Sequence, residues 1–387
     1  MYRKFVVLCT AILLSIQPVM AENEVLGFGF VNDVAVALRD EPDGDLIVRM
    51  EKDSCVWICG STTAGDGEVW YKVNTGKRRS GMGEVLYSGW MMARFIDAGD
   101  GVWQDIQAVS ADRNGMIVLK KDGSVVTAGQ QALSRDGYAW VQMRNWAKEY
   151  EPAVQVSVMS NRGYCLLDGH GAFHSSDSGI LNGMDGETLR LMEGRSDAMF
   201  GITVDNRLVN ASNWEIKEQP WMEPQVLETV VMMTGNDEYL LLLTEEGDVL
   251  AYEYQNNLLG ALPPDFEKWT EIRDMDTAWI HLGDYPAREP QLAYAAVRQD
   301  GTVLAYSEAI ENATKGWTEI RQVEIGSHWV VGLREDGSCI CAGLDGEAAL
   351  DVSGWTEIMN VEAGLDFCVG VEKDGTLVFA GKFFGEK

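Results

Sequence analysis

A charged hairpin turn recurs seven times between residues 120 and 387, and this repeat constrains the fold more than any other feature of the chain. The turns centre on Gly123, Gly171, Asn206, Gly247, Gly301, Gly337 and Gly375, with a mean period of 42 residues. An Asp-Gly or Glu-Gly pair supplies the positive φ of a tight hairpin, and Asn tolerates that conformation well. A period in the low forties with short apolar strands predicts the blades of a β-propeller rather than a helical repeat.

Tryptophan recurs with the turns. Trp103, Trp317 and Trp355 each lie twenty residues before a turn, and three more fill the same role at longer spacings. The full set is Trp103, Trp146, Trp221, Trp269, Trp317 and Trp355. A large flat ring at a fixed place in each repeat favours packing between neighbouring sheets, so we expect these six in the core.

The C-terminus raises the question of how a ring would close. The chain ends soon after the seventh hairpin, at "FAGKFFGEK". Propellers avoid a bare sheet edge by pairing the two chain ends in one blade. We therefore expect a segment within residues 102–133 to complete the last blade.

The first residues have the pattern of a secretory signal peptide. Arg3 and Lys4 precede an apolar run, residues 5–16, and small residues lead up to a cleavage site after Ala21. The apolar run is too short to span a bilayer. Residues 1–21 therefore predict cleavage and export of a soluble bacterial protein, either periplasmic or extracellular, with no insertion into the membrane.

Residues 25–97 form a separate unit of short β-rich runs bounded by Gly, Asp and Asn, which predicts a small barrel or meander. The runs "VALR", "WYKV" and "SGWMM" resemble the bacterial SH3-like domain. That family often binds cell-wall peptides or proteins through an aromatic groove. The resemblance makes Trp70, Tyr71, Tyr87 and Trp90 candidate binding residues, and the alternative is that Trp70 and Trp90 are simply core.

Residues 101–387 carry a second resemblance. "GSHWVVGLREDGSCICAG" and "VEAGLDFCVGVEKDGTLVFAG" are similar to the regulator-of-chromosome-condensation (RCC) repeats, which build a seven-bladed β-propeller. The expected fold is therefore all-β, with a small SH3-like barrel followed by a seven-bladed propeller. The family's nucleotide-exchange role on chromatin does not carry over to an exported acidic chain. Secreted bacterial members are nearer analogues, among them an inhibitor that clamps β-lactamases with one face of its propeller.

Charge and cysteine content narrow the possible ligands. The formal net charge is −29, which disfavours nucleic acid and anionic membrane surfaces. Six cysteines follow the signal peptide, at spacings poorly suited to disulfides, so we expect buried thiols. No C-x-x-C occurs, so zinc is not supported, and no metal or other cofactor is predicted.

Motifs of catalysis are missing: no G-x-S-x-G, H-E-x-x-H, P-loop or EF-hand ladder occurs. His170 and His174 have a spacing that would bind zinc on a helix, but they fall on the second hairpin, which favours turn and surface histidines. His328 occupies the RCC family's usual histidine position, where we expect a structural hydrogen bond. No residue is predicted to be catalytic.

Some aromatic residues are not explained by the repeat. Tyr138, Trp140 and Tyr150 lie in the long loop from Gln130 to Ala153, and Trp214 lies in a later loop. Aromatic residues on loops of a rigid scaffold are typical binding hot spots, so these four are candidates for partner contact. The alternative is that they cover the blade edges locally.

These observations favour an exported, non-catalytic binding protein, expected to be a monomer. Its SH3-like module would attach to the cell envelope, and its propeller would bind a protein partner or a cell-wall component. The alternative from another class is a secreted polysaccharide hydrolase or lyase that uses carboxylates in the propeller's central funnel.

Overall fold

The computed structural model describes residues 27–52, 54–79, 83–98, 103–112, 115–129, 152–159, 163–176, 180, 183–195, 198–211, 216–236, 238–253, 265–283 and 289–381. The predicted signal peptide, residues 1–21, lies outside them. The described chain is dominated by antiparallel strands, with two short α-helices, α3 (Pro224–Leu227) and α4 (Glu308–Thr314). The expectation of an all-β fold is confirmed.

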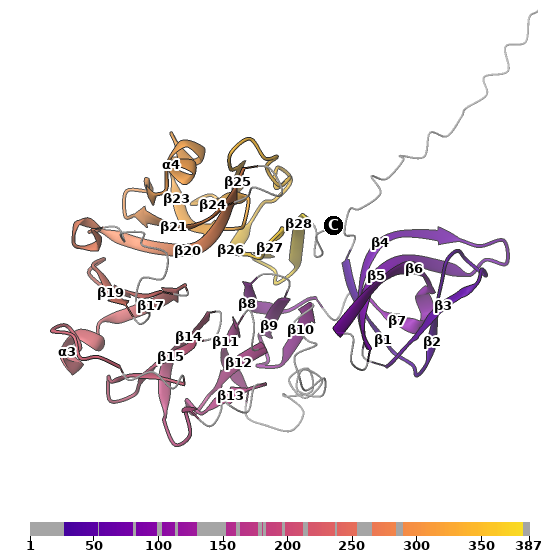
Figure 1. Cartoon of the computed structure of the whole chain (residues 1–387), viewed down its shortest axis with the longest axis horizontal. Coiled ribbons are helices and arrows are strands. Elements are labelled where there is room, and N and C mark those ends of the chain that lie inside the picture. Colours follow the sequence, from indigo (N-terminus) through magenta and orange to yellow (C-terminus); the bar gives the residue numbers. More distant parts are fainter. Residues whose placement is uncertain are drawn as a thin grey trace, which may run out of the picture.

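The N-terminal domain is one strongly curved sheet with the strand order β3-β2-β6-β5-β4-β1-β7 (Figure 1). Its strands are β1 (Gly27–Val31), β2 (Val36–Arg39), β3 (Leu46–Met50), β4 (Cys55–Thr63), β5 (Val69–Arg79), β6 (Gly83–Met92) and β7 (Ile96–Asp97). Alternate residues of these strands bury their side chains in a small core that includes Leu38, Val56, Val73 and Met91. This core gives the domain its own hydrophobic centre.

Seven three-stranded antiparallel sheets follow, each with its second strand in the middle. In chain order they are β8 (Ile106–Asp112), β9 (Gly115–Lys120), β10 (Val125–Gly129); β11 (Ala153–Met159), β12 (Gly163–Asp168), β13 (Phe173–Ser175); β14 (Leu189–Arg195), β15 (Ala198–Thr203), β16 (Leu208–Asn210); β17 (Val230–Gly235), β18 (Tyr239–Thr244), β19 (Val249–Glu253); β20 (Ile272–Leu282), β21 (Glu289–Arg298), β22 (Val303–Tyr306); β23 (Ile320–Ile325), β24 (Trp329–Arg334), β25 (Cys339–Gly343); and β26 (Ile358–Ala363), β27 (Phe367–Glu372), β28 (Leu377–Gly381).

The first strands of these sheets lie side by side around a centre. β8 contacts β11, and the contacts continue in chain order through β14, β17, β20 and β23 to β26, which contacts β8 again. Figure 1 shows the resulting circle of sheets. A closed circle of radially arranged antiparallel sheets is a β-propeller.

Six of the seven hairpin turns are hydrogen-bonded to the next sheet through the turn glycine. The carbonyl oxygen of the turn glycine accepts a hydrogen bond from the first strand of the following sheet, as in Gly301 to Ile320 (3.1 Å) and Gly337 to Ile358 (2.9 Å). A Cβ on Gly247 would lie 2.8 Å from the main chain of Ile272, so these turns need glycine for close approach as well as for positive φ. The repeated turn is therefore the contact that joins neighbouring sheets.

The third turn uses Asn206, with φ of 60°, as the sequence predicts for a non-glycine residue there. Arg190 bridges this junction, since its Nε donates to Asn206 Oδ1 (3.1 Å) and its Nη1 donates to the carbonyl of Val230 (3.0 Å). One long side chain thus joins the third sheet to the fourth.

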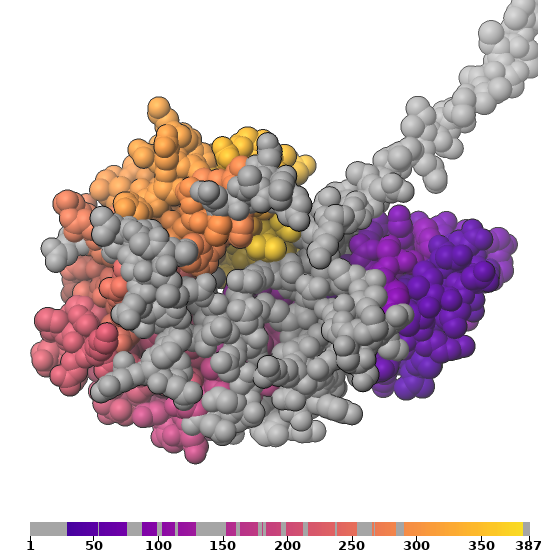
Figure 2. Space-filling model, viewed as in Figure 1, coloured from indigo at the N-terminus to yellow at the C-terminus, as the bar shows by residue number. Residues whose placement is uncertain are grey.

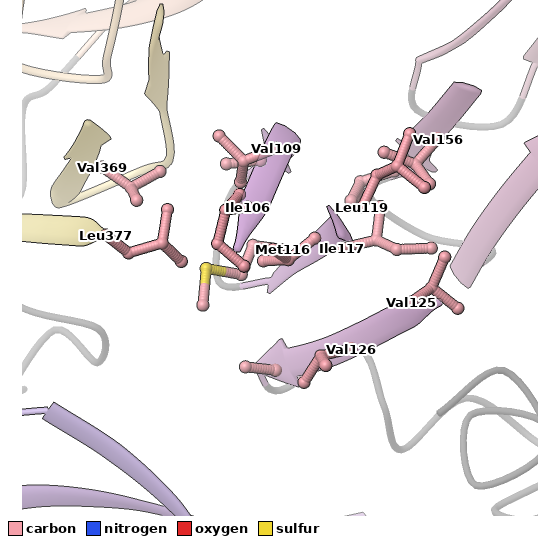
Figure 3. Close-up of a cluster of buried hydrophobic side chains, with 14 of the residues drawn as sticks. Ile106, Val109, Met116, Ile117, Leu119, Val125, Val126, Val156, Val369 and Leu377 are labelled. Atoms are coloured by element: carbon pink, nitrogen blue, oxygen red, sulfur yellow. The ribbon is translucent and has the colours of Figure 1, made fainter. Parts of the chain in front are cut away.

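Ring closure differs from the expectation. Among the described residues the last sheet consists of β26, β27 and β28, and β8, β9 and β10 form a sheet of their own, so these strands do not complete the last blade as predicted. The first and last sheets meet at what we call the seam. There the Ile106 N–H donates to the Gly375 carbonyl (3.0 Å), which is the same turn-to-strand hydrogen bond, or junction bond, that joins other neighbouring sheets. Apolar packing completes the seam, and Figure 3 shows Val369 and Leu377 of the last sheet beside Ile106.

The N-terminal domain packs against this seam. Phe30, Cys55 and Trp57 belong to the same buried cluster as the first and last sheets of the ring. The ring of Phe30 stacks on Trp103 at 6.1 Å, and Trp103 meets Phe379 of β28 edge-on at 6.4 Å. Figure 2 shows the domain as a lobe at one side of the ring. The two parts therefore share one hydrophobic core where the ring closes.

The repeated tryptophans pack between sheets, as expected. Trp269, Trp317 and Trp355 are buried, Trp103 and Trp221 are half-buried against the core, and Trp146 lies outside the described residues. A Cβ on Gly332 would lie 2.7 Å from the ring of Trp317. The glycine in the middle strand leaves the space that the indole ring occupies.

The six described cysteines form no disulfide, as the spacings predict. Five are buried and Cys341 is partly buried. Burial raises the pKa of the Cys339 thiol to about 12 and that of the Cys341 thiol to about 11. These side chains therefore stay protonated and pack as small apolar groups.

The packing of glycine against tryptophan predicts a difference between two alanine substitutions. Gly370→Ala places a Cβ 2.9 Å from the Trp355 ring, whereas a Cβ at Gly354 meets nothing within 4 Å. Gly370→Ala should lower the free energy of unfolding by about 1–3 kcal/mol through overpacking. Gly354→Ala should leave it nearly unchanged. Urea unfolding of both variants measures this, and equal midpoints would contradict the packing described.

Candidate protein-binding face

One end of the ring, which we call the hairpin face, carries the seven turns between second and third strands. The junction hydrogen bonds place the beginning of each first strand at the same end, because turn and strand start are bonded directly. The loops that join first to second strands lie at the opposite end of the strands. The two ends therefore expose different parts of the repeat.

Every first strand has a β-bulge at its second residue. The strand register shifts by one there in all seven sheets. The extra residues, which we call the bulge ring, are Gln107, Val154, Arg190, Val231, Arg273, Arg321 and Met359. A bulge leaves its extra residue out of the pairing and turns the side chain away from the sheet. The bulges thus present seven side chains in a circle on the hairpin face.

The bulge ring combines exposed apolar groups with arginines. Val154, Val231 and Met359 are 53%, 50% and 52% exposed, and six of the seven members are classed as exposed, with Arg321 half-buried. Arg273 pairs with Glu335, and Arg321 donates to the carbonyl of Met359 (2.8 Å). The three apolar side chains lie on the second, fourth and seventh sheets, so the hairpin face exposes them at separate points of one circle.

Four turns of the hairpin face carry an aspartate. In these turns the Asp carboxylate accepts hydrogen bonds from the Ser or Thr two residues later, which lowers the pKa of that Asp. The four are Asp122, Asp300, Asp336 and Asp374. They remain ionised to low pH, and each lies near a lysine or arginine of the same or the adjoining turn.

Polar side chains of the first strands connect neighbouring sheets. Gln322 accepts from the Val361 N–H (3.1 Å) and donates to its carbonyl (2.9 Å) in the next sheet. Gln155 makes the same two bonds to Met192. These side chains bond neighbouring sheets to one another where their main chains are not paired.

Two carboxylates of the first strands have the same structural role. Asp276 accepts from Thr234 (3.4 Å) and from the Ile325 N–H (2.8 Å), and Asp274 accepts from the Val323 N–H (2.7 Å). Burial raises the pKa of Asp274 to about 7. Hydrogen bonds from the adjoining sheet hold these carboxylates in place, so this geometry favours ring assembly over acid-base chemistry on a glycan.

A serine and two histidines meet at the opposite end. The Ser327 hydroxyl lies 2.8 Å from Nδ1 of His281 and 3.5 Å from Nε2 of His328. Ser327 is only 3% exposed, and its N–H donates to the Leu365 carbonyl of the next sheet. Nδ1 of His328 bonds the His281 carbonyl (2.9 Å), which confirms the structural hydrogen bond expected for His328.

The four candidate binding residues of the N-terminal domain differ in how far their side chains are exposed. Trp70 is 1% exposed, so it belongs to the interior, and Tyr71 and Tyr87 pack against the domain core. Trp90 is half-buried and lies opposite Lys72 on β5 and Arg39 on β2. Of the four, Trp90 has an aromatic surface flanked by cations.

The other predicted residues lie mostly outside the described part of the chain. Tyr138, Trp140, Tyr150 and Trp214 are all in undescribed segments. His170 and His174 are on a hairpin, as expected, and Nε2 of His174 lies 3.0 Å from the Asp168 carboxylate.

Sequence reasoning missed the bulge ring, although the repeats hold a trace of it. The motif T-E-I occurs three times and is followed by Arg273, Arg321 and Met359. The motif itself is constant because it supports the junction, whereas the next residue varies. A variable position directly after a constant motif was the available signal.

Among the described residues, no group of three or more His, Cys, Asp or Glu side chains is arranged to hold a metal ion. No helix in that part of the chain has the length and apolar content needed to cross a bilayer.

Comparison with known proteins identifies no family for this chain. No family model matches, and no curated protein matches. The similar solved structures include the ectodomain of the receptor kinase CR4 from Physcomitrella patens, with 13% identity, a TM-score of 0.49 and coverage of 72% of this chain and 74% of that one. The CRINKLY WD40 ectodomain of ACR4 from Arabidopsis thaliana has 13% identity, a TM-score of 0.44 and coverage of 73% and 97%.

Prp20p from Saccharomyces cerevisiae, described with its binding to Gsp1p and histones, has 14% identity, a TM-score of 0.37 and coverage of 71% and 72%. Matches at these identities and scores carry no functional argument. The description of the ring as a propeller rests on its own sheets and junctions.

Proposed function

We propose that this protein is an exported bacterial binding protein, in which an SH3-like domain precedes a seven-bladed propeller of the RCC type. Each three-stranded sheet is one blade. The repeat period of 42 residues, the seven turns and the position of His328 support this assignment.

The propeller binds a protein partner through its hairpin face, and the protein acts as a monomer. The observation that carries this proposal is the bulge ring, which exposes Val154, Val231 and Met359 on a rigid scaffold. Apolar side chains held on rigid strands lose little entropy on binding, which suits them to a protein interface. Arginine, present three times in the ring, is also enriched at interfaces.

The N-terminal domain attaches the protein to the cell envelope. The signal-peptide pattern of residues 1–21 supports export, and the half-buried Trp90 between Lys72 and Arg39 supports binding of an anionic, ring-containing wall polymer. An aromatic face stacks on sugar rings while the two cations attract the polymer's charge. These three residues form a positive site in a chain whose net charge is −29.

A double variant of the bulge ring tests the protein-binding proposal. Val231→Ser with Met359→Ser removes exposed apolar surface without adding charge. Partners captured from an envelope fraction by the immobilised parent should bind the double variant at least tenfold more weakly, a loss of about 1.4 kcal/mol or more. Val34→Ser with Tyr306→Ser alters exposed apolar residues elsewhere and should bind as the parent does. Equal binding by the bulge-ring variant would exclude the hairpin face.

Co-sedimentation with purified cell wall tests the envelope proposal. Deletion of residues 25–97 is unsuitable, because Phe30 and Trp57 are part of the propeller's core. Trp90→Ala and Lys72→Ala should each reduce the sedimented fraction several-fold. Arg94→Ala, which removes a cation paired with Glu68 on the same domain, is the control and should sediment like the parent. The site is wrong if all three variants sediment like the parent, or if Arg94→Ala is the only one that loses binding.

A further inference from the structure

The hairpin face contains a hollow between the second and third sheets of the ring. Its volume is about 410 Å³, and it opens to solvent. Leu167 and Leu189 are buried and form its floor, while Val154 and Val204, 53% and 60% exposed, stand at its edge. Apolar groups thus line both the floor and part of the rim.

The Asp168 and Arg190 side chains of the hollow are already engaged. Asp168 accepts from the main-chain N–H groups of His170 and Ala172, and its other oxygen lies 3.0 Å from His174. The guanidinium of Arg190 donates to main-chain carbonyls, including that of Val230, and to Asn206. Since these donors and acceptors are bonded within the protein, the hollow recognises an apolar group better than an anion.

The volume suits a large side chain of a partner together with its adjoining main chain. Small-ligand pockets span about 300–1,000 Å³, so the hollow lies at the lower end of that range. Interface hot spots are typically large side chains that insert into such pockets. The exposed Val154 and Val204 would cover the inserted group from water.

Three carboxylates and two arginines lie around the hollow. Glu228 and Glu245 are exposed and close enough to act on the charge of Arg190, and Asp205, which follows Val204 in the chain, forms an ion pair with Arg207 (2.9 Å). Carbonyl oxygens around Arg190 offset its positive charge further. A segment that approaches this rim is attracted if it carries lysine or arginine and is repelled if it carries carboxylates.

We infer that this hollow is the anchor site for a cationic segment of the partner protein, whose aromatic or large aliphatic side chain inserts between Val154 and Val204. This rests on the proposed function and specifies where on the hairpin face the partner is held and by what chemistry.

Labelled heptapeptides test the site directly by fluorescence anisotropy. The first probe is Gly-Lys-Lys-Phe-Lys-Lys-Gly, the second replaces each Lys with Glu, and the third replaces Phe with Ala. The first should bind the parent at least tenfold more tightly than either of the others, and added salt should weaken it. Equal binding of the three peptides would overturn the inference.

Two valines of the hollow and one on the N-terminal domain provide matched variants. Val154→Lys places a cation at the rim and should weaken the first probe at least tenfold, and Val204→Lys is a second variant with the same expectation. Val34→Lys makes the same change at an exposed valine away from the hairpin face and should stay within twofold of the parent. Parent-like binding by the Val154 and Val204 variants would overturn the site.

The outcomes separate the two proposals. If the Val231 and Met359 double variant loses the captured partner but the lysine-rich peptide shows no preference for the hollow, the binding face stands and the anchor site is wrong. If that double variant keeps the partner, the hairpin face itself is wrong, whatever the peptides do.

Discussion

The ring depends on the hydrogen bond that a turn-glycine carbonyl accepts from the first strand of the next sheet. This bond needs a residue without a Cβ at the turn, because the neighbouring main chain approaches within about 3 Å of where that Cβ would be. Six of the seven junctions use glycine, and Arg190 bridges the one that has Asn206. The same bond closes the ring between Gly375 and Ile106, where strand exchange was expected. The turn therefore repeats because every sheet needs it to reach its neighbour.

Close junctions also explain where the ring can vary. The start of a first strand is bonded to the turn of the preceding sheet and to the turn of its own sheet, as in Ile320 to Gly301 and Glu319 to Glu335. The bulge that follows therefore has a fixed direction, whatever its side chain. Val, Met, Arg and Gln all occupy this position without disturbing the sheet. Stability is thus carried by the turn, the glycine–tryptophan packing, the polar side chains of the first strands and the bonds of Arg190 and Arg321 to the next sheet. Recognition is left to the apolar bulge residues Val154, Val231 and Met359. Such a division suits a scaffold that binds proteins.

The repeat was readable from the sequence because positive φ, alternating burial and large core rings each demand particular residue types. Seven turns and the core role of Trp269, Trp317 and Trp355 follow from those demands. The closure was misjudged, because three strands per sheet and the docking of Phe30 on Trp103 depend on long-range packing that no local pattern encodes. The bulge ring and the hollow escaped for a similar reason: Val154 and Val204 are far apart in the chain and become neighbours only when two sheets meet. Trp70 shows the reverse, an aromatic residue proposed for binding that the domain instead buries.

Native-state hydrogen exchange at the junction amides tests the closed ring most directly. The N–H groups of Ile106, Ile320 and Ile358 make equivalent junction bonds, but only that of Ile106 crosses the seam between the first and last sheets. If the seam is as firm as the other junctions, all three amides should exchange slowly, at similar rates, through global unfolding of the ring. Fast exchange at Ile106, with Ile320 and Ile358 still protected, would show that the ring opens at the seam and would contradict this description.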